Sequence, residues 1–135
     1  MRKHSAFNIT LMTGVMVLAA VLSVTFSASR ALAADFLTSD EVKKLVSGNT
    51  VHVEVSGKGE FKAYLNSDGK VTRMHDGQTL EGVWRIKDDG ALCVRYSDKE
   101  ESCGSVKKNS DGTYTRIDDA KATNHWTKVL KGKDL

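Results

Sequence analysis

The stretch GVWRIKDDGALCVRYSDKEESCGSV, residues Gly82–Val106, carries the clearest fold signal in this chain. Apolar and polar residues alternate on both sides of Asp88–Gly90, a turn sequence in which glycine supplies the positive φ of a short hairpin loop. With these three residues as the loop, Trp84 lies opposite Val94, and the apolar side chains share one face. The stretch therefore predicts three short antiparallel strands joined by two turns.

The second of these turns, centred near Asp98, brings the two cysteines together. It places Cys93 opposite Cys103 and Arg95 opposite Glu101, on the face away from the apolar side chains. Directly opposed strand residues have Cβ atoms roughly 4.5–5.5 Å apart, close to the separation that a disulfide needs. The alternatives are free thiols or half a metal site, but the chain has only two cysteines and no histidine near them. We predict a Cys93–Cys103 disulfide.

Residues 1–33 have the layout of a secretory signal peptide. The basic start Met1–His4 precedes an apolar run, Ile9–Phe26, and Ala31 and Ala33 fit an A-x-A cleavage site. An uncleaved membrane anchor is the alternative, because the run approaches the ~18 residues that can span a bilayer. Polar residues within the run and the cleavage site favour removal, and the absence of a nearby cysteine excludes a lipoprotein.

Removal of the leader leaves residues 34–135 as a single β-barrel-like domain with a balanced charge. The chain has 20 Lys and Arg and 17 Asp and Glu; the leader holds three of the cations and no acid, so 17 of each remain. This balance gives no electrostatic argument for nucleic acid or an anionic membrane surface as a partner. We expect a periplasmic protein with no stable membrane anchor after cleavage, since disulfides persist in oxidising compartments.

From residue 50 onward, turn sequences recur about every ten residues, a spacing typical of all-β sandwiches and barrels. The seven turns lie at Gly57–Gly59, Ser67–Gly69, Asp76–Gln78, Asp88–Gly90, Asp98–Lys99, Asn109–Gly112 and Asp119–Ala120. A loop at Gly57–Gly59 would place Val55 opposite Phe61. We predict a roughly eight-stranded antiparallel up-and-down meander that forms a small lipocalin-like barrel, closed or partly open. An open, curled sheet is the alternative.

One short helix is predicted before the strands. Thr38 can cap it while Glu41 reaches back in a capping box, and Gly48 can end it. Val42 and Val46 lie on one face. At about ten residues this helix is too short to be stable alone, so we expect it to pack near one end of the barrel.

The sequence contains no recognisable catalytic constellation. No Ser-His-Asp arrangement, reactive-cysteine context or phosphate-binding loop is present, and His52, His75 and His125 lack the spacing of metal ligands. The two Asn-Ser-Asp-Gly tetrapeptides lack the acid that closes a calcium loop, so hairpin turns are predicted there. We expect a protein that is not an enzyme and uses no metal or other cofactor.

Five aromatic residues are the candidate ligand-binding side chains: Trp84, Tyr96, Phe61, Tyr64 and Trp126. In a small barrel, aromatic side chains either line a cavity that holds an apolar ligand or simply fill the core. The leading hypothesis is a non-catalytic binding module for a small apolar ligand or a periplasmic protein partner. The alternative is an inhibitor of an envelope hydrolase, comparable in size and compartment to small periplasmic lysozyme inhibitors.

Three segments of the chain resemble a bacterial exported family, domain-of-unknown-function family 995. They are LTSDEVKKLVSGNTV (Leu37–Val51), FKAYLNSDGKV (Phe61–Val71) and the central stretch Gly82–Val106. The shared pattern is an amphipathic helix ending in Gly-x-Thr-Val, a strand that ends in Asp-Gly, and a Trp…Cys…Cys core. The resemblance weakens after Thr115. It implies a small periplasmic β-rich domain from a Gram-negative bacterium and no catalytic residue.

Overall fold

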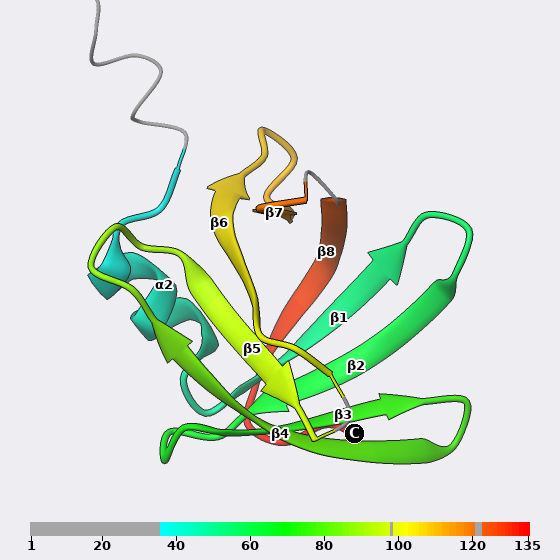
Figure 1. Cartoon of the computed structure of the whole chain (residues 1–135). Helices are drawn as coiled ribbons and strands as arrows, with labels where there is room; N and C mark the ends of the chain where they lie inside the picture. Colours follow the sequence, from blue (N-terminus) through cyan, green and yellow to red (C-terminus); the bar gives the residue numbers. More distant parts are fainter. Residues whose placement is uncertain (1–35, 98, 121–122) are drawn as a thin grey trace, which may run out of the picture.

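The chain forms a closed antiparallel β-barrel in which the strands follow the order of the sequence (Figure 1). The computed structural model describes residues 36–97, 99–120 and 123–135, so the predicted leader lies outside the described residues. The elements are α2 (Ser39–Val46), β1 (Asn49–Val55), β2 (Gly59–Leu65), β3 (Lys70–His75), β4 (Gln78–Ile86), β5 (Leu92–Tyr96), β6 (Ser102–Lys108), β7 (Tyr114–Asp118) and β8 (Thr123–Lys131). The predicted eight-stranded up-and-down barrel is confirmed, and pairing of β1 with β8 closes it.

The register of the central hairpins agrees with the prediction. Trp84 pairs with Val94 across β4 and β5, and Cys93 pairs with Cys103 across β5 and β6. Both registers follow from the turn sequences, because loop length decides which residues face each other.

The first hairpin has a different register from the predicted one. Phe61 lies opposite Val53, whereas Val55 lies opposite Gly59, which is already part of β2. The loop therefore consists of residues 56–58 and not of residues 57–59. A shift of two residues preserves the faces of both strands, since side chains alternate with a period of two.

Three of the turns share one hydrogen-bonding scheme. After β2, β4 and β6, an aspartate carboxylate accepts a hydrogen bond from the backbone N–H two residues further along, at Asp68, Asp89 and Asp111. A glycine with positive φ stands between the two residues in each case. The two Asn-Ser-Asp-Gly tetrapeptides are thus hairpin turns, as predicted.

The helix α2 covers the barrel end at which β4 ends and β5 begins (Figure 1). Its capping box is formed: the backbone N–H of Thr38 donates to Glu41 Oε2 at 2.8 Å, and that of Glu41 donates to Thr38 Oγ1 at 3.4 Å. The helix spans eight residues and not ten, because Ser47 is already its C-cap. Val42 and Val46 are fully buried, so the helix closes this end of the core.

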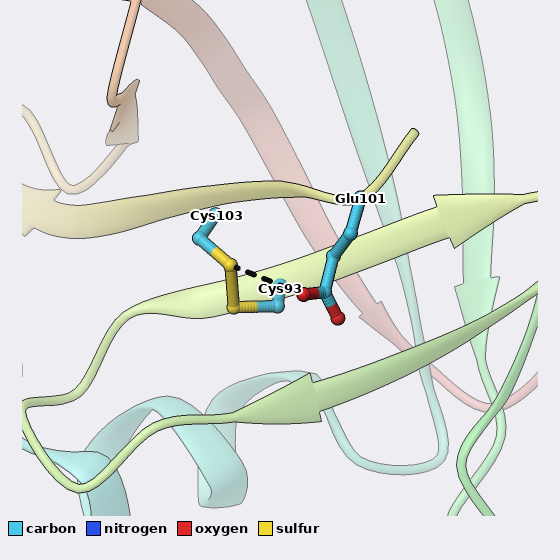
Figure 2. A group of neighbouring side chains, drawn as sticks. All are labelled: Cys93, Glu101 and Cys103. Carbon is cyan, nitrogen blue, oxygen red and sulfur yellow. Dashed lines mark hydrogen bonds between the residues drawn. A yellow bond between two sulfur atoms is a disulfide. The ribbon is translucent and has the colours of Figure 1, made fainter. Parts of the chain in front are cut away.

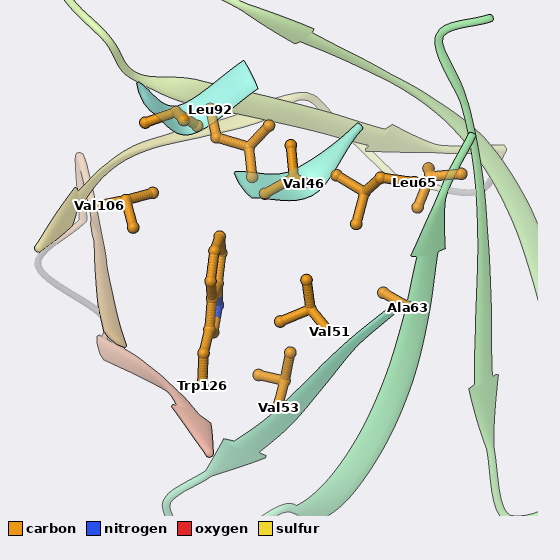
Figure 3. Close-up of a cluster of buried hydrophobic side chains, with 10 residues drawn as sticks. Val46, Val51, Val53, Ala63, Leu65, Leu92, Val106 and Trp126 are labelled. Carbon is orange, nitrogen blue, oxygen red and sulfur yellow. The ribbon is translucent and has the colours of Figure 1, made fainter. Parts of the chain in front are cut away.

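The core consists of these helix residues and the inward side chains of the strands. Figure 3 shows Val46 from α2 above Val51, Ala63 and Trp126 from the barrel wall. A register shift between β1 and β8 lets Trp126 and Val129 stand opposite Val53 and Val51, respectively. In the part of the chain that the structure describes, no helix has the length and apolar character required to cross a bilayer.

Candidate ligand cavity

The barrel interior contains a cavity of about 310 Å³ that opens at the end opposite α2. Lys58 and Lys99, in the turns after β1 and β5, lie at its mouth. Apolar side chains from the strands form most of its wall: Val51, Val53, Val55, Phe61, Ala63, Leu65, Val71, Leu92, Val94 and Trp126. The closed barrel thus holds a pocket, because the helix fills one end of the interior and leaves the other accessible.

Three of the five aromatic residues named as candidates line this cavity. Phe61 and Tyr96 are half-buried on β2 and β5, and Trp126 is 3 % exposed on β8. Each stands at an inward position of its strand, in line with the predicted alternation.

The other two candidate aromatic residues lie outside the cavity. The indole Nε1 of Trp84 donates to the carbonyl oxygen of Asn66 at 2.8 Å, which ties β4 to the turn after β2. Tyr64 lies between two inward residues of β2 and therefore faces outward, where Lys133 Nζ is 5.9 Å from its ring centroid.

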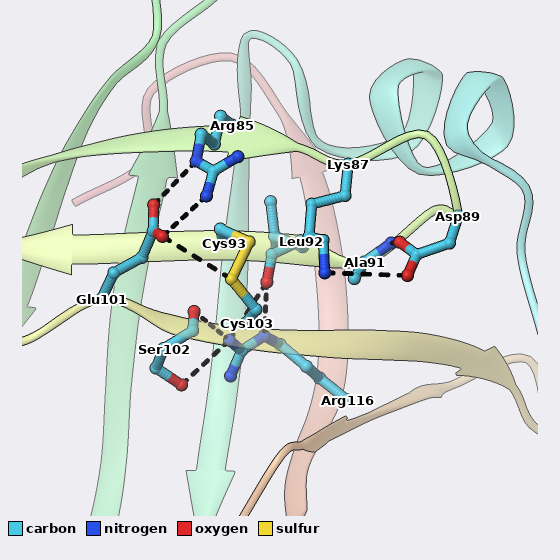
Figure 4. Close-up of a disulfide and its surroundings, with 10 residues drawn as sticks. All are labelled: Arg85, Lys87, Asp89, Ala91, Leu92, Cys93, Glu101, Ser102, Cys103 and Arg116. Carbon is cyan, nitrogen blue, oxygen red and sulfur yellow. Dashed lines mark hydrogen bonds and ion pairs between the residues drawn. A yellow bond between two sulfur atoms is a disulfide. The ribbon is translucent and has the colours of Figure 1, made fainter.

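A buried arginine forms one polar part of the cavity wall. Arg116 is 6 % exposed, and its Nη2 donates to the backbone oxygens of Ser102 at 2.7 Å and Leu92 at 3.1 Å (Figure 4). Burial lowers the pKa of the Arg116 guanidinium, and attraction to the Asp118 carboxylate opposes this shift. Gly104 makes room for the side chain, since a Cβ there would lie 3.1 Å from Arg116 Cγ.

A second arginine reaches the cavity from β3. The Cζ atom of Arg73 lies 4.1 Å from the ring centroid of Phe61 and 5.9 Å from that of Tyr96, within the range of cation–π attraction. Its Nε is buried and has no hydrogen-bond partner among the described residues. A buried N–H without a partner is uncommon in folded proteins, so this atom is an unusual feature of the cavity wall.

Tyr96 interacts electrostatically with both Arg73 and Arg116, and we call these two arginines the arginine pair. Burial raises the pKa of Tyr96, and both Arg73 and Arg116 act to lower it through their charges. Arg73, Tyr96 and Arg116 all line the cavity and therefore face a common space.

The charges around the cavity favour anions. The charged lining residues are the cations Lys58, Arg73, Lys99 and Arg116 and the acids Glu100 and Asp118. Four cations against two carboxylates leave an excess of positive charge in a space with mostly apolar walls.

The arginine pair is absent from the site residues that the sequence predicted. Arg73 stands two residues after Val71, so both side chains lie on the inward face of β3. On β7, Arg116 stands two residues from Tyr114 and two residues from Asp118. A cation at an inward position interrupts the apolar alternation, so these strands look irregular in a search for apolar periodicity. That interruption is itself the signal that could have located the pair.

The predicted disulfide joins Cys93 and Cys103 on the outer face of the barrel. Figure 2 shows Glu101 beside it, with Oε2 3.8 Å from Cys103 Sγ. An oxidised sulfur carries no proton, so this approach is a contact and not a hydrogen bond. Within the described ranges, these three residues are the group close enough to suggest a metal site, but both sulfurs are committed to the disulfide.

The hydrogen-bond partner of Glu101 is a residue of β4 and not Arg95, the residue predicted to lie opposite it. Arg85 of β4, and not Arg95, donates to both carboxylate oxygens, at 2.8 and 2.7 Å (Figure 4). Arg85 pairs with Cys93, and its long side chain reaches Glu101, which precedes Cys103 by two residues. These hydrogen bonds lower the pKa of Glu101.

Comparison with known proteins places the chain in a family. A family model described as "Protein of unknown function (DUF995)" matches residues 12–125, which include every cavity-lining strand from β1 to β7 and the start of β8. No curated protein and no solved structure matches the chain. The family match confirms the resemblance seen in the three sequence segments, and the chain belongs to the DUF995 family of proteins of unknown function.

Proposed function

We propose that this protein is an exported, non-catalytic module that binds a small, largely apolar molecule inside its barrel. The cavity carries the proposal: it measures about 310 Å³, has mainly apolar walls and opens away from α2. Ligand pockets in proteins have volumes of roughly 300–1,000 Å³ and combine apolar walls with a few polar groups. This cavity has both properties.

The construction of the barrel favours binding over catalysis. Closure by β1 and β8 holds the walls in place, so a ligand would enter a largely formed pocket at a low ordering cost. The buried cations are guanidinium groups, which stay protonated and exchange no proton with a substrate. Such groups suit the recognition of a ligand more than general acid–base chemistry.

Export to the periplasm is part of the proposal. The Cys93–Cys103 disulfide supports it, because disulfides persist in oxidising compartments. The signal-peptide pattern of residues 1–33 also supports export.

Solution NMR with 1-octanol tests the binding function. At roughly 30 Å³ for each water-sized group, the cavity holds about ten non-hydrogen atoms, close to the size of this probe. With protein purified after expression of the full chain, we expect saturable shifts of the backbone amide signals of cavity-lining residues. The Ala63→Phe variant, which fills the cavity from β2, should lose these shifts, and Glu60→Phe, an exposed change on the same strand, should keep them.

An absence of saturable shifts, or shifts confined to the outer face, would overturn the binding function. The alternative function would then be favoured, in which the protein acts through its surface as an inhibitor of an envelope hydrolase. Residual lysozyme activity in the presence of the protein would test that alternative.

A further inference from the structure

We propose that the ligand is an amphipathic carboxylate, whose head group binds the arginine pair and whose apolar tail occupies the opposite wall. This inference rests on the proposed function and specifies the class of ligand. Arginine donors match the geometry of a carboxylate, which can accept two parallel hydrogen bonds from one guanidinium.

The two sides of the cavity differ in chemistry. β3, β5 and β7 contribute Arg73, Tyr96 and Arg116 beside the apolar Val71, Leu92 and Val94, whereas β1 and β2 contribute only apolar side chains to the lining. An amphipathic molecule satisfies both sides at once, because its head group and its tail have different solvation needs. A purely apolar molecule would leave the Arg73 guanidinium without a charged partner.

Arg73 is the member of the pair with a free donor. Its Nε is buried and has no hydrogen-bond partner in the described part of the chain, and the Phe61 ring stacks against its guanidinium. Stacking fixes the plane of the guanidinium and leaves its N–H groups directed around the edge. A carboxylate beside Arg73 would therefore bind a pre-oriented donor with little loss of side-chain freedom.

Arg116 supplies positive charge and has few spare interactions. Its Nε and Nη2 donate to neutral oxygens of Leu92 and Ser102, including the Ser102 hydroxyl at 3.2 Å. These bonds hold the guanidinium in place without neutralising it. Burial strengthens the attraction between this charge and an anion, since the local dielectric is lower than that of water.

The volume of the cavity sets how much of a ligand the barrel interior can hold. About 310 Å³ accommodates roughly ten non-hydrogen atoms. Octanoate is a carboxylate of this size, while 1-octanol and octylammonium have the same chain with a neutral or a cationic head group. The three probes separate the contribution of the tail from that of the charge.

Isothermal titration calorimetry with these probes tests the inference. The protein is purified after expression of the full chain and freed of bound small molecules by unfolding and refolding with the disulfide intact. We expect octanoate to bind at least about tenfold more tightly than 1-octanol, because each hydrogen bond to a charged group strengthens binding by roughly tenfold or more. Octylammonium should bind more weakly than 1-octanol, since the cavity carries excess positive charge.

Variants assign the preference to Arg73. Arg73→Gln should weaken octanoate binding by roughly tenfold or more and leave 1-octanol binding within about twofold. Arg95→Gln is the matched control, because it removes a cation from an exposed position next to Tyr96, and it should change neither affinity. Arg73 is the residue to change first, since Arg116 is tied to two backbone oxygens and its replacement can unfold the barrel.

The outcomes separate the two proposals. Equal affinities for octanoate and 1-octanol, or an Arg73→Gln variant that binds octanoate normally, would overturn the carboxylate inference and leave the binding function standing. Tightest binding of octylammonium would overturn it as well. If no probe binds, the proposed function fails together with the inference.

Discussion

At the scale of single residues, the neighbours across a strand decide what each polar side chain can do. Gly104 on the adjacent strand leaves room for Arg116 inside the barrel: a Cβ at Gly104 would lie 3.1 Å from Arg116 Cγ and 2.8 Å from the Ile117 oxygen. Arg85 donates two hydrogen bonds to Glu101, although its neighbour in the register is Cys93. A pairwise register alone would not predict either arrangement.

The Arg85–Glu101 pair should make stability depend on pH. Hydrogen bonds from Arg85 lower the pKa of Glu101 in the folded state, so the pair stabilises the fold above the unfolded-state pKa of about 4.3. This stabilisation is lost as the pH falls through the lower, folded-state pKa. We expect urea unfolding of Glu101→Gln to show a smaller decrease in stability between neutral and acidic pH than the wild type.

Glu100→Gln is the control for this measurement, because it removes the neighbouring carboxylate and leaves the Arg85 pair intact. It should retain the wild-type pH dependence below about pH 4.3. Identical pH profiles for the two variants would show that the ion pair has no effect on stability.

At the scale of elements, the turn after β4 joins the barrel to the helix. Gly90 is buried with a φ of +90°, and a Cβ there would lie 2.6 Å from the Leu37 oxygen and 3.2 Å from the Ser39 nitrogen. The turn therefore packs directly against the start of α2. Gly112 occupies the same position in the turn after β6, with a φ of +86°, but open space surrounds it.

Alanine substitutions at these two glycines measure how tightly the start of α2 packs against the turn after β4. Both changes impose the cost of a positive φ on a residue with a Cβ, but only Gly90→Ala also forces the helix start to move. We expect Gly90→Ala to lower the free energy of unfolding by about 1–3 kcal/mol more than Gly112→Ala, as is usual for overpacking. Urea titrations followed by circular dichroism provide the measurement, and equal losses would contradict a tight contact between turn and helix.

At the scale of the whole molecule, three features hold the barrel as one unit: the closing pair of β1 and β8, the helix over one end and the disulfide. The disulfide spans a sequence separation of ten residues and links β5 to β6, which lie on opposite sides of the turn near the cavity mouth. It therefore restrains a part of the wall that includes Tyr96 and Ser102, both of which line the cavity.

Export and oxidation should both be visible in the mass of the protein. After expression of the full chain in a Gram-negative host, we expect an intact mass that corresponds to residues 34–135 with both cysteines oxidised. Reductant should lower the free energy of unfolding by about 2–3 kcal/mol, since the short loop is then no longer closed in the unfolded chain. An uncleaved mass would contradict export with processing, and unchanged stability in reductant would contradict a stabilising disulfide.

Several local features of this protein can be read from its sequence alone. The turn at Asp88–Gly90, the pairing of Cys93 with Cys103 and the capping box of Thr38 and Glu41 all depend on partners within about ten residues. Loop length, alternation and capping chemistry act over that range, so these three features are readable from the chain, whereas the register of the first hairpin is shifted by two residues from the prediction. The regular spacing of the turns extended the same logic to the number of strands.

Which residues meet inside the barrel depends on the three-dimensional fold and cannot be read from local patterns. Closure of β1 on β8 brings Val53 opposite Trp126, and the curvature of the wall directs Arg73 and Arg116 towards the same cavity as Tyr96. An inward arginine can lie in a packed core, line a cavity or stand at the mouth of a cavity. Which of these applies depends on the residues that lie across the barrel. Periodicity assigns a side chain to a face, but the side chains that share an interior are chosen by strand tilt, closure and packing of the complete sheet.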